Sequence, residues 1–93
     1  MPYKHFKMLN SRIKIDILNI ISNKECTVTE VTSELKNRGY KVKYRESIYR
    51  HLEKYNELGL VEKKYDPNEK KITYTSKYEK IIFNIKEQSI TFL

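Results

Sequence analysis

Apolar positions in the first quarter of the chain recur with the period of an α-helix. Most of these apolar residues would form one stripe along the helix, but Ile15 and Leu18 lie outside it. A helix with apolar residues on more than one face is usually buried on more than one side. We predict a helix over about residues 6–22, with Asn10 or Ser11 as the cap of a slightly shorter version. The main stripe, which follows the 3.6-residue period, consists of Phe6, Leu9, Ile13, Ile17, Ile20 and Ile21.

Two shorter helical patterns follow. The first begins with Thr29 as its N-cap, and Gly39 ends it because glycine adopts a positive φ at little cost. The second is predicted over about residues 44–58, and Gly59 ends it in the same way. The residues of these two helices that we expect to face inward are Val31, Leu35, Ile48, Leu52 and Tyr55.

After Gly59 the apolar pattern changes from helical to alternating. Residues 60–65 and the β-branched and aromatic residues 71–75 indicate two strands, joined by the turn sequence Asp66-Pro67-Asn68-Glu69. Ser76-Lys77-Tyr78-Glu79 has the spacing of a capping box. We therefore predict a hairpin over about residues 60–75 and a last helix over about residues 77–92.

Length and composition exclude several classes of protein. Ninety-three residues, 39% of them hydrophobic, suit a single folded domain over residues 1–93 rather than a disordered tail. No apolar run approaches the ~18 residues of a membrane span, and the N-terminus does not resemble a signal peptide, so we expect no membrane partner and a cytoplasmic location. A lone cysteine, Cys26, cannot form an internal disulfide; whether it has a redox role is left open.

The sequence offers no chemistry for a reaction. It lacks a glycine-rich phosphate loop, a nucleophile elbow and a paired-carboxylate motif, and neither histidine has companions at metal-ligand spacing. We therefore expect no enzymatic activity, no cofactor and no bound metal.

The charge balance favours an acidic partner. Nineteen Lys and Arg against twelve Asp and Glu give a net charge of +7, and residues 36–45 hold five bases and no acid. Such a surface attracts nucleic acid. A lysine-rich surface that only keeps the protein soluble remains the alternative.

The predicted order α-α-α-β-β-α, mainly α with one β-hairpin in an α+β chain, is that of a winged helix. Three segments carry a closer resemblance: Cys26–Leu35 resembles the first half of a helix-turn-helix, Ser47–Leu52 followed by Leu58–Val61 resembles an "S-[VI]-Y-R-H-L … L-G-L-V" run, and Ile72–Glu79 resembles the entry to a last helix. These segments are similar to the winged helix-turn-helix transcriptional regulators, the superfamily of MarR-, PadR- and ArsR-like repressors and of small regulators from archaea and their viruses.

The resemblance implies a homodimeric, sequence-specific regulator that binds double-stranded DNA. Residues 44–58 are then the recognition helix in the major groove, and residues 60–75 are the wing on the backbone or in the minor groove. Arg45 and Arg50 are the best base readers, because a guanidinium group matches guanine O6 and N7. The full set of candidate DNA-binding residues is Lys43, Tyr44, Arg45, Glu46, Ser47, Tyr49, Arg50, Lys54, Lys63, Lys64, Lys70 and Lys71.

Other interpretations of these residues stay open. The outward face of the recognition helix can be a plain solvated surface with Glu46 and Arg50 as an i, i+4 pair, and the hairpin lysines can protect an edge strand from pairing. At the level of function the alternatives are a protein–protein adaptor in a transcription or replication assembly and a nonspecific nucleoid-coating protein. A small enzyme subunit is the least favoured, and any small-molecule effector is unknown.

Surplus apolar residues on the two terminal helices indicate self-association. Phe83 and Ile90 are seven residues apart, as a helix–helix seam requires, and lie opposite the face expected to cover the domain. The predicted dimer interface consists of Phe6, Ile15, Leu18, Phe83 and Ile90.

Overall fold

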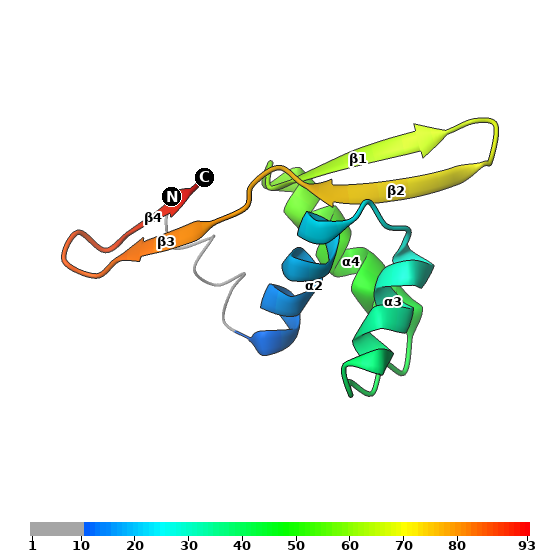
Figure 1. The fold of residues 1–93 in the computed structure, drawn as a ribbon, viewed down its shortest axis with the longest axis horizontal. Helices are drawn as coiled ribbons and strands as arrows, with labels where there is room; N and C mark the ends of the chain where they lie inside the picture. The colour runs from blue at the N-terminus through cyan, green and yellow to red at the C-terminus, as the bar shows by residue number, and fades with distance from the viewer. Residues whose placement is uncertain (1–10) are drawn as a thin grey trace.

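The computed structural model describes residues 11–93, in which three helices are followed by two β-hairpins (Figure 1). The three helices pack together beneath the first hairpin, and the second hairpin lies on the other side of the molecule. Phe6 and the predicted beginning of the first helix lie outside the described residues. The elements are α2 (Arg12–Asn23), α3 (Val28–Asn37), α4 (Arg45–Glu57), β1 (Val61–Asp66), β2 (Lys71–Ser76), β3 (Ile81–Asn84) and β4 (Ser89–Phe92).

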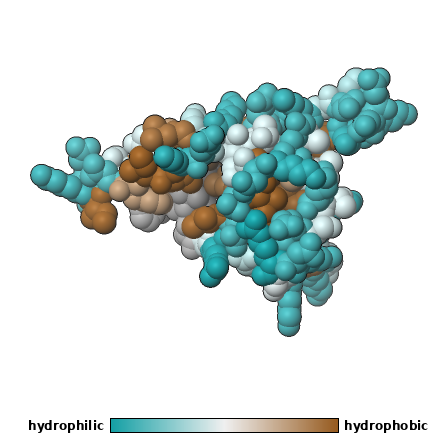
Figure 2. Space-filling view, in the orientation of Figure 1, coloured by the Kyte–Doolittle hydropathy of each residue, from teal (hydrophilic) through white to brown (hydrophobic). Residues whose placement is uncertain are grey.

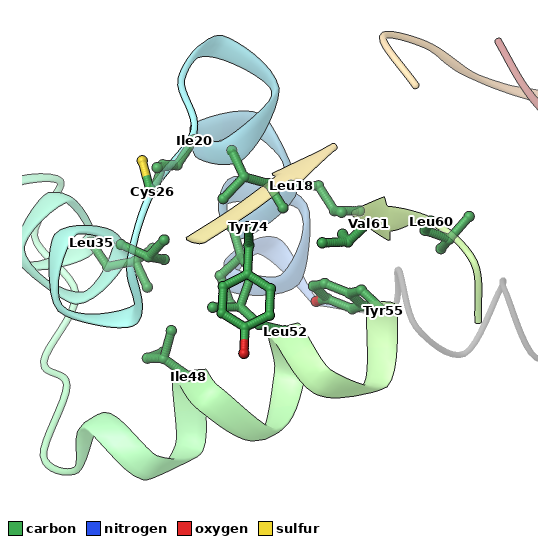
Figure 3. Packing of buried hydrophobic residues seen from close by; sticks show 13 residues of the cluster. Leu18, Ile20, Cys26, Leu35, Ile48, Leu52, Tyr55, Leu60, Val61 and Tyr74 are labelled. Atoms are coloured by element: carbon green, nitrogen blue, oxygen red, sulfur yellow. The ribbon is translucent and has the colours of Figure 1, made fainter. Parts of the chain in front are cut away.

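One hydrophobic core joins the three helices to the base of the first hairpin (Figure 3). The stripes predicted for α3 and α4 supply it, since Val31, Leu35 and Leu52 are fully buried. Tyr55 of α4 and Tyr74 of β2 are the largest fully buried side chains. Helix α4 is therefore anchored in the core by its inner face, and its outer face does not take part in this packing.

The N-cap of helix α3 lies two residues before the predicted one. Thr27, rather than Thr29, is the N-cap: its Oγ1 accepts the Glu30 N–H at 3.2 Å, and the Glu30 carboxylate accepts the Thr27 N–H at 2.9 Å. This reciprocal pair satisfies two amide groups that have no partner inside the helix. It also lowers the pKa of Glu30, mainly because the carboxylate accepts the Thr27 backbone N–H. Thr29 is thus released from capping.

The first hairpin, β1 and β2, has the form predicted for a wing. Its register runs from Val61 opposite Ser76 to Asp66 opposite Lys71. The turn is closed by the Asp66 carboxylate, which accepts the N–H groups of Asn68 and Glu69. This hairpin is called the wing below.

The base of the wing is tied to the connection between α2 and α3. The Cys26 N–H donates to the Tyr74 carbonyl at 3.0 Å, and the Tyr74 N–H donates to the Cys26 carbonyl at 2.7 Å. The wing is therefore attached to the helices by backbone as well as by side chains. Three helices and a wing confirm a winged helix of class α+β.

The predicted last helix is wrong. Residues 77–92 form no helix, and β3 and β4 make a second antiparallel hairpin in their place. The Ser76 hydroxyl accepts the Tyr78 N–H and donates to the Tyr78 carbonyl, which closes a local turn, and the Glu79 N–H donates to the carbonyl of Leu93. The order α-α-α-β-β-α therefore holds only as far as the second strand.

This change also removes the helical seam predicted for a dimer. Phe83 and Ile90 lie directly opposite each other across β3 and β4, rather than two turns apart on one helix. Leu18 is buried in the core of its own domain, and Ile15 is half-exposed on α2.

Figure 2 shows hydrophobic residues over the second hairpin and hydrophilic ones over the tip of the wing. Within residues 11–93, no helix combines the length and apolar character that crossing a membrane requires.

Candidate nucleic-acid interface

The wing and the start of α4 enclose an open cleft of about 590 Å³. Four elements line it, namely the first turn of α3, the first two turns of α4 and both strands of the wing, together with Lys70 from the turn of the wing. It brings together five of the predicted DNA-binding residues from segments far apart in the sequence, namely Arg45, Glu46, Tyr49, Lys70 and Lys71. The remaining lining residues are Thr27, Val28, Thr29, Tyr65, Ile72 and Tyr74.

The loop before α4 presents exposed cationic and aromatic side chains. Tyr44 is the N-cap residue, and its carbonyl accepts both the N–H and the hydroxyl of Ser47. The Lys43 ammonium lies 5.5 Å from the centroid of the exposed Tyr44 ring. Since the first amides of a helix also carry partial positive charge, this end of α4 is suited to anionic groups.

Arg45 is fixed in place by α3. Its Nη1 donates to Thr29 Oγ1 at 2.8 Å, which links the start of the recognition helix to the first turn of the preceding helix. Thr29, left free by the cap at Thr27, is therefore a positioning residue for Arg45. The sequence spacing of 16 residues contains no signal for this contact.

Arg50 forms the ion pair that the alternative interpretation anticipates. Its Nη2 lies 2.9 Å from Glu46 Oε1, and both side chains are largely exposed. A pair of this kind contributes only about 0.3–0.5 kcal/mol. Both groups can therefore be recruited by a ligand at small cost, so the pair does not decide between the two interpretations.

Lys54 and Lys63 each form an ion pair within the protein, which makes their charges less available to a ligand. Lys54 lies 3.8 Å from Glu57, and Lys63 lies 2.9 Å from Glu53. The Glu53 carboxylate also accepts the hydroxyl of Tyr74. This hydrogen bond, followed by the contact with Lys63, lowers the pKa of Glu53. Lys63 thus helps to hold the wing on α4, a role that the sequence did not indicate.

Lys64 of the wing lies outside the cleft. Side chains alternate along a strand, and Lys64 pairs with Thr73, so it faces away from the cleft, whereas Tyr65 and Ile72 share the cleft-facing side with Tyr74. Lys64 is therefore not brought together with the other candidates.

At the wing tip, Lys71 and Lys70 differ in their surroundings. Lys71 lies 2.6 Å from Glu69, and this hydrogen bond raises its pKa. Lys70 has φ +52° in the turn and forms no ion pair with residues 11–93. The Lys70 ammonium is therefore more available to an anionic ligand than that of Lys71.

Some of the basic stretch between residues 36 and 45 is structural. Arg38 donates to Asn19 at 2.9 Å and lies 3.4 Å from both Asp16 and Glu34, so it ties α3 to α2. Lys41 and Lys43 lie in the loop before α4 and form no ion pair among the described residues. Lys41 and Lys43 therefore place two cations close to the start of α4.

The described residues offer no constellation for a metal. No group of three His, Cys, Asp or Glu side chains is placed to hold an ion within residues 11–93. Cys26 is buried, and burial is the main cause that raises its pKa and so favours the thiol form.

A comparison with protein families agrees with this geometry. Residues 15–77 match the model of the ribonuclease R winged-helix domain, a span that begins within α2, includes α3, α4 and the wing, and ends before β3. No curated protein and no solved structure matches the chain. The winged-helix resemblance is confirmed, whereas kinship with MarR-, PadR- or ArsR-like regulators and an archaeal or viral origin stay predictions.

Proposed function

The chain belongs to the ribonuclease R winged-helix domain family, and we propose that it binds double-stranded DNA. In this proposal α4 enters the major groove and the wing lies against the neighbouring backbone. One observation carries the proposal. The exposed, cationic start of α4 and the wing tip border the same cleft, so both can reach one duplex.

The dimensions and charges of α4 suit this role. Thirteen residues give a helix about 20 Å long, and the major groove, about 12 Å wide, admits an α-helix. Lys41 and Lys43 precede its first turn, where they can contact phosphates. Arg45 and Arg50 present the fork that pairs with guanine.

The finer proposal is a sequence-specific regulator that occludes or recruits RNA polymerase. It is supported by the resemblance of Ser47–Leu52 and Leu58–Val61 to transcriptional regulators and by the two outward arginines of α4. The proposed role is binding, without catalysis. The competing roles are a protein–protein adaptor and a nonspecific coating protein.

We also propose that the protein acts as a homodimer through its second hairpin. Ile82 and Phe83 are half-exposed and Ile85 is almost fully exposed, and a two-stranded hairpin of this size gains stability from further packing. A two-fold dimer implies a roughly palindromic site. Sedimentation should show a dimer for the wild type and a monomer for a Phe83→Glu, Ile90→Glu double mutant. A monomeric wild type at micromolar concentration contradicts this part of the proposal.

The experiment that tests the function is a selection followed by a titration. Duplexes enriched from a random DNA pool are compared with scrambled duplexes by fluorescence anisotropy at several salt concentrations. Ribonuclease R is by its name an enzyme that acts on RNA, so a duplex RNA of the same sequence provides a third arm. A large affinity ratio supports the regulator, a ratio near one supports the coating protein, and absence of binding to DNA contradicts the proposal.

A further inference from the structure

The cleft between α4 and the wing has an apolar wall that phosphate binding does not require. Tyr65 of β1 and Ile72 of β2 face each other across the hairpin and are 62% and 37% exposed. Tyr49 of α4, 43% exposed, lines the same cleft. A tyrosine hydroxyl can donate a hydrogen bond to a phosphate, but charged phosphates gain little from the flat faces of the two rings or from the Ile72 side chain. The wall is therefore suited to a flat, apolar group.

The charged residues of the cleft also disfavour an anion as its occupant. A phosphate site directs several donors at one point. Here Lys71 is paired with Glu69, and the Glu46 carboxylate, which is paired with Arg50, lines the same cleft, so few donors converge on one point. A neutral group can enter beside Glu46, while cations such as Lys70 neutralise phosphates on either side of it. A nucleobase within a nucleic-acid strand has this distribution of charge.

The proposed docking brings a strand to the cleft. A helix in the major groove and a wing on the adjacent backbone lie on two sides of one sugar–phosphate strand, so that strand crosses the space between them. Extruding a base that is paired inside a duplex costs a few kcal/mol of unpairing and unstacking, whereas an unpaired base is extruded at lower cost. Such a base would meet Tyr65 and Tyr49.

We propose that the cleft between α4 and the wing binds one unpaired nucleobase, extruded from the strand that crosses it, by stacking on Tyr65 and Tyr49. This inference rests on the proposed binding of duplex DNA. The carboxylate of Glu46 accepts an exocyclic amino group of the base, and Ile72 covers the edge of the stack. The preferred ligand is a duplex that contains a bulged or mismatched nucleotide.

The test compares the affinity for a fully paired duplex with the affinities for a series of duplexes of the same sequence. Each member of the series carries one bulged 2-aminopurine, at a different position of the bound site. Stacking on an aromatic side chain is strong enough to change affinity by about tenfold or more. We expect at least one bulge position to bind about tenfold more tightly than the paired duplex, with a change in 2-aminopurine fluorescence. Tyr65→Ala should bring the ratio of the affinities for the bulged and the paired duplex close to one. Tyr65→Phe, which keeps the ring, should preserve this ratio.

Tyr78 provides the control. It is an exposed tyrosine between the wing and the second hairpin, outside the cleft and outside the candidate DNA-binding residues, so Tyr78→Ala should leave the ratio of the two affinities unchanged. Melting curves establish that each variant folds. A wild-type ratio near one at every bulge position, with binding to the paired duplex intact, overturns this inference and leaves the proposed function standing. Absence of binding to any of the duplexes overturns both.

Discussion

Removal of the Tyr74 hydroxyl tests how the wing is held on the recognition helix. Tyr74 is fully buried at the base of the wing, and its hydroxyl donates to Glu53 Oε2 of α4. The same carboxylate oxygen lies 2.9 Å from Lys63 Nζ of β1. The substitution Tyr74→Phe keeps the ring in the core and removes only this hydrogen bond, so its effect can be estimated from a single interaction.

The expected loss follows from the charge and exposure of Glu53. A hydrogen bond to a charged group contributes about 1.5–3 kcal/mol. The Glu53 side chain is 30% exposed and keeps Lys63 as a partner, so the lower end of this range applies. We expect Tyr74→Phe to lower the free energy of unfolding at pH 7 by about 1.5 kcal/mol, which for a domain of this size lowers Tm by about 6–12 °C.

The loss should depend on pH. The hydrogen bond from Tyr74, with the help of Lys63, lowers the pKa of Glu53 in the folded protein. A carboxyl group of this kind adds stability above its unfolded pKa of about 4.3, and the added stability disappears as the pH falls through the folded pKa. A protonated Glu53 still accepts a neutral hydrogen bond, about half as strong. The difference between wild type and Tyr74→Phe should therefore fall to about half at low pH.

Urea unfolding followed by circular dichroism at pH 7 and about pH 3 measures these differences. Glu53→Gln and the double mutant complete a thermodynamic cycle, and Tyr65→Phe is the control, because the Tyr65 ring is exposed and its hydroxyl donates to no described residue. Equal stability of wild type and Tyr74→Phe at pH 7 would refute the reasoning. A loss of the same size at both pH values would refute the role of the Glu53 charge.

Three further substitutions test the cap, the base reader and the wing tip. Thr27→Ala removes one half of the capping box of α3 and should cost about 0.5–2 kcal/mol in urea unfolding, whereas Thr29→Ala should cost less; the reverse order would contradict the assignment of the cap. Arg50→Ala should weaken specific DNA binding by about 1–3 kcal/mol with an unchanged melting curve, and equal affinity would exclude Arg50 as a reader. The double substitution Lys70→Ala, Lys71→Ala should weaken specific and nonspecific binding alike and reduce the slope of log affinity against log salt by about one unit per lost phosphate contact; an unchanged slope would place the wing tip away from the DNA.

The helices and the wing could be predicted because local patterns and tertiary packing agree in them. The stripe of Ile48, Leu52 and Tyr55 is buried as expected, and Gly39 and Gly59 follow their helices with φ +96° and +78°. Only the cap of α3 was misplaced. Thr27 and Thr29 both precede acidic and apolar residues, and only Thr27 has Glu30 three residues later, which is the spacing that the reciprocal hydrogen bonds require.

The prediction of a last helix was wrong because the helical repeat and the alternation of a strand both fit the same residues. Tyr78, Ile81, Ile82 and Ile85 satisfy the helical repeat, but Ile81 and Phe83 also alternate along a strand. The Asn84 carboxamide accepts the Glu87 N–H and so helps to close the turn between β3 and β4. Strand pairing of residues 81–84 with residues 89–92 then outweighs a weak capping signal.

The site could be predicted only in part, because its charges are arranged by contacts between distant elements. The Glu46–Arg50 pair follows from helical spacing and was expected. The contact of Arg45 with Thr29 depends on how α3 packs against α4. The position of Lys64 outside the cleft depends on strand register, which also brings Tyr65 and Ile72 to the cleft.

The two backbone hydrogen bonds between Cys26 and Tyr74 have a consequence for motion. They connect residues distant in sequence at the base of the wing, whereas the tip extends beyond the helices (Figure 1). Amide hydrogens at the base should therefore exchange with deuterium only when the whole domain opens, and those of Asn68 and Lys70 should exchange within the folded state. We therefore expect any bending of the wing to occur beyond this attachment, toward its tip, so that the width of the opening toward α4 can change without disturbing the core.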